Sequence, residues 1–324
     1  MKKLILLGST ALLATACATT GGNDVKTDKV AAEKSKAYVE GLSYVMAGTS
    51  GGVCAVPTAA QKAAMSSSDG PSKEWKDLLM KASACAGDKN WKTLEQVAET
   101  MARVDINAPW GAYFLAVAAE GTGEYQRAIW MIELAQKKAG VANGLFMYEH
   151  GRIMLGMKDT AHAMADVTKA VALEPRLTMG HLFLAQIHQR DLEWDKAGEH
   201  FAAVLAQDDR NVVALAGLGE VRFNQGKHQE AADLYSKAIS WNSSHLEWWL
   251  RLGSIYETNL KNSELALNTY KGLRSSLDKG VVKSRPTSID LNAKIKTLED
   301  SMNAARQPAA QASAAKTDQA RSKK

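Results

Sequence analysis

The sequence predicts an all-α protein in which helical hairpins stack one after another along the chain. The first observation is composition: 46% of the 324 residues are hydrophobic, but only 6% are aromatic and only six are prolines. Sheets favour β-branched and aromatic residues, so this balance favours helices. The second observation is a period of 34 residues, marked by the small residues Gly151, Ala185, Gly219 and Gly253. Hairpins repeated at such a period bury their apolar faces by stacking, which predicts a solenoid.

A third observation is the helical spacing inside each period. Twelve residues after the first three small residues stand Ala163, Ala197 and Ala231, and four further on stand Val167, Phe201 and Tyr235. In the fourth period the columns slip by one residue, to Ala266 and Tyr270. Residues four apart share one face of a helix. We therefore expect the small residue to allow a close approach of two helices, and the aromatic or Val side chain to fill the gap against the next hairpin.

These columns resemble the tetratricopeptide repeat (TPR) family. The family pattern W-x₂-L-G-x₂-Y is matched by Trp249, Leu252, Gly253 and Tyr256. Gly123 and Gly226 fall at the family's turn between the two helices of a hairpin. The resemblance implies a right-handed α-solenoid of stacked TPR hairpins whose first helices line a concave groove.

The repeats divide the chain as follows. We expect a degenerate unit at 73–107 and five regular units at 109–143, 144–177, 178–211, 212–245 and 246–280. Residues 281–305 carry an apolar stripe suited to a helix that caps the open end of the stack. Residues 306–324 are Ala, Gln, Ser and basic residues, which predicts a disordered tail.

The first residues predict export from the cytoplasm. Two lysines precede an apolar run, Leu4 to Leu13, that is too short for a membrane span, so residues 1–16 are expected to be a signal peptide. The small residues that lead into Cys17 resemble the lipobox of bacterial lipoproteins. That resemblance implies lipidation of Cys17 and, with Ala18 next to it, an outer-membrane location facing the periplasm. The alternative is an ordinary signal peptide with Cys17 incidental. Residues 17–72 read as a tether, an amphipathic helix and loops.

Two further cysteines, Cys54 and Cys85, would then lie in an oxidising compartment. We expect a disulfide between them, which would stabilise the fold by about 3 to 4 kcal/mol. Two buried free thiols are the alternative.

The sequence carries no nucleotide, metal or nucleophile motif. Gly121-Thr122-Gly123 lies at a turn between helices with no lysine after it, so it is not a phosphate loop. His181 and His188 share a helical face, but they stand where the family has packed aromatic residues. We therefore expect a non-enzyme with no cofactor, no metal and no small-molecule substrate.

The predicted partner site is the concave groove. Carried over from the family register, its residues are Trp110, Tyr113, Val117, Tyr148, Arg152, Leu182, Gln186, Arg190, Glu220, Phe223 and Asn224. We expect Trp110, Tyr113 and Tyr148 to be exposed there and to hold a peptide in pockets. The alternative is that these residues only solvate the inside of the coil.

The formal charge of +5 belongs to the ends of the chain. Lys2 and Lys3 leave with the signal peptide, and residues 305–324 hold five basic side chains and one acidic one. The remaining body is near neutral, and export argues against a nucleic-acid partner.

The function expected is that of a lipid-anchored periplasmic scaffold. The chain resembles TPR lipoproteins that help type IV pilus secretins assemble and those of gliding-motility machines. This implies binding of another envelope protein: a secretin, a motility or barrel-assembly component, or a cell-wall enzyme. The alternative is a cell-wall-associated factor held at peptidoglycan by its basic tail.

Overall fold

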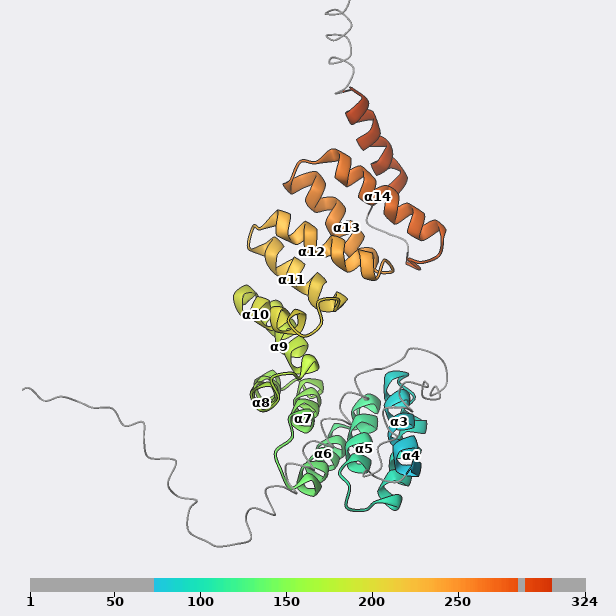
Figure 1. Cartoon of the computed structure of the whole chain (residues 1–324), viewed down its shortest axis with the longest axis vertical. Helices are drawn as coiled ribbons and strands as arrows, with labels where there is room; N and C mark the ends of the chain where they lie inside the picture. Colours follow the sequence, from blue (N-terminus) through green and yellow to red (C-terminus); the bar gives the residue numbers. More distant parts are fainter. Residues whose placement is uncertain (1–72, 285–288, 305–324) are drawn as a thin grey trace, which may run out of the picture. The chain divides into compact units, whose positions relative to one another are not determined.

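The computed structural model describes residues 73–284 and 289–304, and these residues form helices and no strand. The predicted all-α fold class is confirmed. The described residues fall into two compact units (Figure 1), a first unit up to Asp159 and a second unit from Thr160 onward. The division lies inside the expected repeat 144–177. The expected signal peptide, Cys17, Cys54 and the basic tail lie outside the described residues.

The described part of the first unit, from residue 73 to Asp159, contains five helices that pack in chain order. They are α3 (Lys73–Gly87), α4 (Trp91–Val104), α5 (Trp110–Thr122), α6 (Tyr125–Ala139) and α7 (Gly144–Gly156). Helix α5 contacts α4, α6 and α7, and nine of its 13 residues are buried. Its sequence is apolar around the whole circumference, which is typical of a helix covered on every side.

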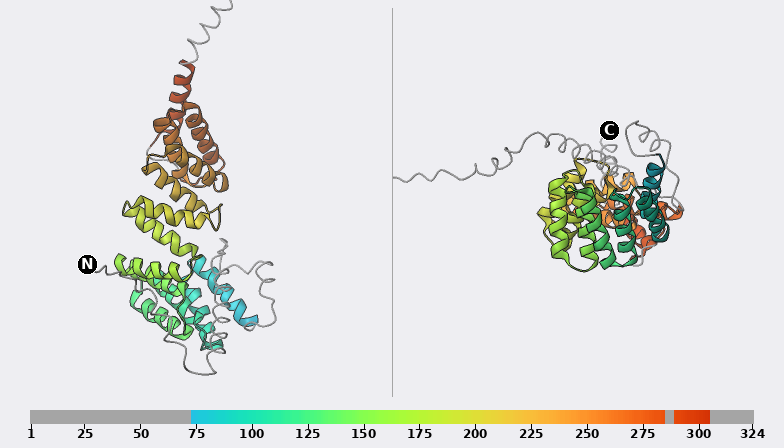
Figure 2. Two further views of the ribbon diagram at one scale, coloured as in Figure 1. Left: turned by 60° about the vertical axis from the view of Figure 1, so that its left-hand side comes forward. Right: turned by 90° about the horizontal axis from the view of Figure 1, so that it is seen from below.

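The second unit continues with α8 (Thr160–Leu173), α9 (Thr178–Arg190), α10 (Trp194–Leu205), α11 (Val212–Asn224), α12 (His228–Trp241), α13 (Leu246–Ser254) and α14 (Ser263–Asp278). Helices α9 to α14 form three hairpins, each packed on the next (Figure 2). A π-helical turn over Ile255–Asn259 follows α13 directly. Within the described part of the chain, no helix combines the length and the apolar character needed to cross a membrane.

The small residues of the repeat lie where side chains of the neighbouring helix leave no room. A Cβ atom added to Gly253 would come within 2.5 Å of the Tyr270 ring, and one added to Gly219 within 3.1 Å of the Tyr235 ring. Gly217, outside the repeat column, is packed in the same way, since a Cβ atom there would come within 2.3 Å of the Phe201 ring. Ala197 and Ala231 are fully buried. Phe201 of α10 thus packs on α11 of the next hairpin, as the spacing predicts.

The turns inside the hairpins share one backbone conformation. A left-handed residue recurs at intervals of 34 or 35 residues, at Lys89, Gly123, Lys158, Leu192, Gly226 and Lys261. Gly123 and Gly226 occupy the turns expected for them, and φ is +82° and +75° there. Side chains destabilise this conformation, so the other four turns carry a cost that glycine avoids.

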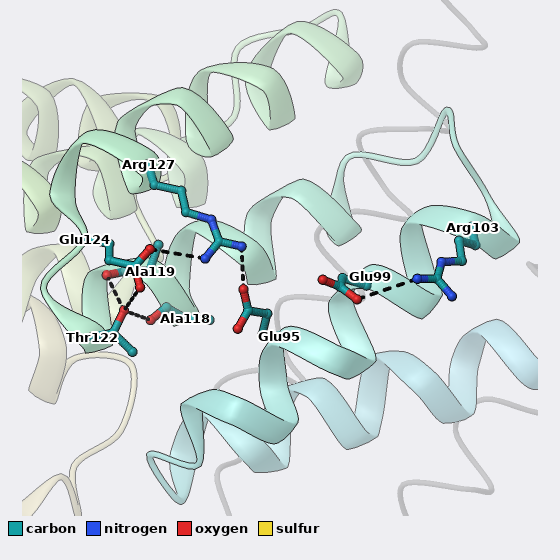
Figure 3. A network of polar contacts seen from close by, with 8 residues as sticks. All are labelled: Glu95, Glu99, Arg103, Ala118, Ala119, Thr122, Glu124 and Arg127. Atoms are coloured by element: carbon teal, nitrogen blue, oxygen red, sulfur yellow. Dashed lines mark hydrogen bonds and ion pairs between the residues drawn. The ribbon is translucent and has the colours of Figure 1, made fainter.

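A polar cluster on the surface of the first unit links α6 to α4 (Figure 3). Arg127 on α6 forms ion pairs with Glu95 on α4 and with Glu124 at the start of its own helix. The Thr122 hydroxyl, which has one proton to donate, lies within hydrogen-bond distance of the Glu124 carboxylate and of the carbonyl oxygens of Ala118 and Ala119. Arg127 and Glu95 are both more than a third exposed, so the cluster orients the helices more than it stabilises them.

The last described residues of the second unit, 291–304, are helical. Leu291, Ile295 and Leu298 are buried together with Tyr270 and Leu273 of α14. Surface ion pairs from Lys271 to Glu299 and from Lys294 to Glu257 flank this apolar contact. The terminal helix therefore covers the apolar face that the last hairpin would otherwise expose.

Candidate functional site

A groove of about 660 Å³ crosses the first helices of the three hairpins in the second unit. It is lined by Gln186 and Gln189 of α9, by Val213, Ala216, Gly217 and Glu220 of α11, by Glu247, Trp248, Leu250, Arg251 and Ser254 of α13, and by Phe201 and Tyr235 of the second helices. Three successive hairpins contribute, because the first helix of each repeat faces the same side of the stack.

The centre of the groove is a network around the Glu220 carboxylate. The Tyr235 hydroxyl donates to it at 2.7 Å, the Arg251 guanidinium at 2.8 Å and the Asn224 side-chain amide at 3.2 Å. Burial raises the pKa of Tyr235, and the hydrogen bond to Glu220 raises it further. The network joins α11, α12 and α13, and it holds the two hairpins in a fixed register.

Aromatic contacts support the charged groups of the groove. The Arg251 guanidinium lies 4.8 Å above the Phe223 ring, an arrangement in which the ring face attracts the cation. The rings of Trp248 and His245 are stacked, with centroids 3.9 Å apart. The side chains of this wall are therefore ordered before any partner binds.

The floor of the groove is apolar. Val213, on the first helix of its hairpin, is 44% exposed. Ala216 and Gly217 beside it are small, and Gly217 is the residue against which the Phe201 ring packs. Val213 is therefore the side chain of α11 that gives this part of the groove an exposed apolar surface.

The structure places only some of the predicted groove residues of the second unit in or beside the groove. Gln186 and Glu220 line the groove, Phe223 lies below Arg251, and Asn224 donates to Glu220. Leu182 is half-buried and packs on the core that includes Phe201. Arg190 is exposed and paired with its neighbour Asp191, outside the groove lining.

In the first unit, the expectation of exposed aromatic residues is wrong. Trp110 and Tyr113 are each only 3% exposed, and Val117 and Tyr148 are also buried. The Trp110 and Tyr113 rings lie 5.8 Å and 5.4 Å from the ring of Phe146 on α7. These side chains belong to an aromatic core between α5 and α7, because α5 is apolar on all sides and is covered on all of them.

Arg152 is the centre of a second charged network, in the first unit. Its guanidinium binds Glu120 of α5 at 3.0 Å and Glu149 of its own helix at 3.1 Å. Burial raises the pKa of Glu149 although Arg152 opposes the shift, and burial raises the pKa of Tyr148 to about 12. Arg152 is thus engaged in holding α5 and α7 together.

Arg251 and Trp248 are groove residues that the family register does not predict. A signal for Arg251 is present in the sequence: Glu220 and Arg251 are 31 residues apart, and Glu120 and Arg152 are 32 apart. An acidic residue followed by an arginine just short of one repeat marks an ion pair between neighbouring first helices in both units.

Cys85, on α3, is fully buried and disulfide-bonded. Its partner lies outside the described residues, so the pairing with Cys54 stays a prediction. Within the described residues, no group of three or more His, Cys, Asp and Glu side chains is arranged to hold a metal ion.

Comparison with known proteins supports the TPR resemblance. Residues 213–245 match the tetratricopeptide repeat family. No curated protein matches the sequence. Among solved structures, PilF of Pseudomonas aeruginosa superposes with a TM-score of 0.54 at 12% identity, covering 70% of this chain and 97% of PilF.

Two further structures are similar. PilW, described as a widely conserved type IV pilus biogenesis factor, has a TM-score of 0.52 at 14% identity, covering 70% of this chain and 99% of PilW. The C-terminal part of a TPR repeat-containing protein from Cytophaga hutchinsonii has a TM-score of 0.50 at 15% identity, covering 61% of this chain and 79% of that one. The chain therefore has the fold of tetratricopeptide-repeat solenoids, and residues 213–245 are one repeat of that family.

Proposed function

We propose that this chain is a protein-binding scaffold that uses the groove of the second unit to recruit or stabilise another protein of the bacterial envelope. The groove is the observation that carries the proposal. It is lined by three hairpins, its central charges are fixed by Tyr235 and Phe223, and its floor exposes Val213. An ordered recess with an apolar floor and a polar rim is suited to a polypeptide segment.

The location proposed is the periplasmic face of the outer membrane, with the chain anchored by lipid on Cys17. The support is the leader sequence described above. Replacing Cys17 by Ser is expected to move the protein from the membrane fraction to the soluble periplasmic fraction, and mass spectrometry of the wild-type N-terminus should find acyl chains. An unmodified Cys17 in the mature wild-type protein would refute the anchor.

Among envelope machines, we favour type IV pilus or gliding-motility assembly. The support is the likeness of the leader and repeats to lipoproteins of those machines and the shared fold with PilW, itself a type IV pilus biogenesis factor. The test is loss of surface pili or of surface motility on deletion of the gene, restored by the wild-type chain.

The groove itself is tested by a pair of matched substitutions. Val213→Arg places a long charged side chain on the groove floor, whereas Leu265→Arg places the same side chain at a residue of similar exposure on α14, outside the groove. Envelope proteins captured by the wild type and by Leu265→Arg should be lost with Val213→Arg. If Val213→Arg retains every captured protein, the groove is not the partner site.

A further inference from the structure

The positive charge of Arg251 in the centre of the groove is neutralised by Glu220 of the same protein. Arg251 is the only basic side chain among the described residues that line the groove, and it binds Glu220 at 2.8 Å. Its guanidinium is also held against the Phe223 ring. The carboxylate of a partner's C-terminus would therefore share Arg251 with Glu220, whose negative charge lies beside it. This repulsion disfavours use of Arg251 as a clamp for a free C-terminus.

Glu247 is a charged group of the groove that is not neutralised. It lies in the first turn of α13, it is exposed, and it has no ion-pair partner among the described residues. With Glu220 and Arg251 cancelling each other, Glu247 leaves the groove lining with a net negative charge. A basic side chain of a partner complements that charge.

Two amides on the opposite wall are also available. The side chains of Gln186 and Gln189 line the groove, and neither makes a hydrogen bond to another described residue. Residues three apart on a helix have Cβ atoms about 5–6 Å apart, and main-chain groups on the same side of an extended chain recur about every 6.6 Å. Each amide both donates and accepts, so the two side chains can pair with successive peptide groups of an extended segment.

The floor sets one further requirement. Val213 and Ala216 of α11 and Leu250 of α13 are the aliphatic side chains of the groove lining. Side chains of an extended segment alternate in direction, so those facing the floor are two residues apart. The segment that fits has an apolar side chain toward the floor and a basic side chain toward α13.

We propose that the groove of the second unit binds an internal, extended segment of another protein, read by its main chain at Gln186 and Gln189 and by a Lys or Arg side chain at Glu247. This inference rests on the proposed function and adds the chemistry of the partner. It requires neither a free C-terminus nor an acidic side chain in the bound segment.

Two bead-bound libraries of random 12-residue peptides test the inference with the full mature chain. Both libraries are N-acetylated, and one ends in an amide while the other ends in a free carboxylate. We expect the same peptides to be selected from both, with Lys or Arg enriched at one position and an apolar residue near it. The Val213→Arg variant should bind none of the selected peptides, and the Leu265→Arg variant should bind all of them.

Matched substitutions assign the two kinds of contact by fluorescence anisotropy on a selected peptide. Glu247→Gln is expected to weaken binding by about 2- to 5-fold and to abolish the preference for Lys over Gln in the peptide, as for an exposed ion pair. Glu264→Gln, in the first turn of α14 and outside the groove, should change neither. The double variant Gln186→Ala, Gln189→Ala should weaken binding of the peptide with Lys and of the same peptide with Gln by the same factor, because main-chain contacts are independent of sequence.

Three results would overturn the inference: enrichment of acidic residues, selection only from the free-carboxylate library, or an absence of groove-dependent peptides. Any of these leaves the proposed function standing if Val213→Arg still loses the natural partner in the capture experiment. If Val213→Arg keeps the natural partner as well, the groove fails as a binding site and both proposals fail.

Discussion

The Glu220 carboxylate and the Arg251 guanidinium come from neighbouring repeats and meet at 2.8 Å in the groove of the second unit. Replacing Arg251 by Met removes the strongest donor to Glu220 and leaves a partly buried carboxylate with fewer partners. We expect the free energy of unfolding to fall by about 1–2 kcal/mol. Urea denaturation measures this change. Arg103→Met, which removes an exposed pair with Glu99, should have no measurable effect, and an equal loss in the two variants would contradict the assigned role.

Substitution of Leu192 by glycine is expected to stabilise the fold. It occupies the left-handed turn between α9 and α10 with φ of +60° and is 66% exposed, so its side chain contributes little packing. Leu192→Gly should raise stability by about 1 kcal/mol because a left-handed backbone is costly for residues with a Cβ atom. Thermal denaturation gives the value. Gly226→Ala, at the equivalent turn of the next repeat, should lower stability by a similar amount.

Acid is expected to weaken the α9–α10 hairpin through His200. Burial, together with His181 and His188 nearby, lowers the pKa of His200 from 6.5 to about 4. The folded protein therefore binds fewer protons than the unfolded chain between these values, so stability is fully present above pH 6.5 and declines as the pH falls toward 4.

The size of that decline is expected to be about 1–2 kcal/mol, less than the full shift implies because His200 is only half-buried and is screened by solvent. Unfolding of the wild type and of His200→Gln in urea at pH 7.5, 6 and 5 provides the comparison. The wild type should lose stability faster than the variant. Parallel pH profiles would show that His200 does not titrate in this way.

Reduction of the Cys85 disulfide should destabilise the fold. If Cys54 is the partner, the bond closes a loop of 31 residues, and its loss is expected to cost about 3 to 4 kcal/mol. Mass mapping without reductant identifies the partner, and unfolding curves with and without dithiothreitol give the cost. A peptide that links Cys85 to Cys17 would refute the predicted pairing and the lipidation of Cys17 together.

The repeat register could be predicted because it follows from packing between nearest neighbours. Gly253 is small because Tyr270 approaches it, and Ala197 is small because it is fully buried, so the constraint at each position appears again about 34 residues later. For the same reason the register places Gln186 and Glu220 in the groove. Local spacing is sufficient where the packing partner itself stands at a fixed column of the repeat, as Tyr270 does for Gly253.

The register fails for Trp110, Tyr113 and Tyr148 because it assigns a face and does not say what covers that face. The sequence of α5 does indicate burial, because it has no charged residue from Trp110 to Ala119, which is typical of a helix with no exposed face. The register does not predict the role of Arg251 for a related reason, since it assigns positions one at a time and does not pair Glu220 with a charge on the next repeat.

The recurring left-handed turns allow one whole repeat length to be removed from the second unit. Leu192 and Gly226 have equivalent backbone conformations 34 residues apart, so excision of residues 192–225 would join Asp191 to Gly226 without interrupting a helix. The shortened chain would pair the first helix of one repeat with the second helix of the next, and Ala231 would meet α9 in place of α11. Duplication or loss of a whole repeat would thus change the length of the binding surface and leave the joints between repeats intact.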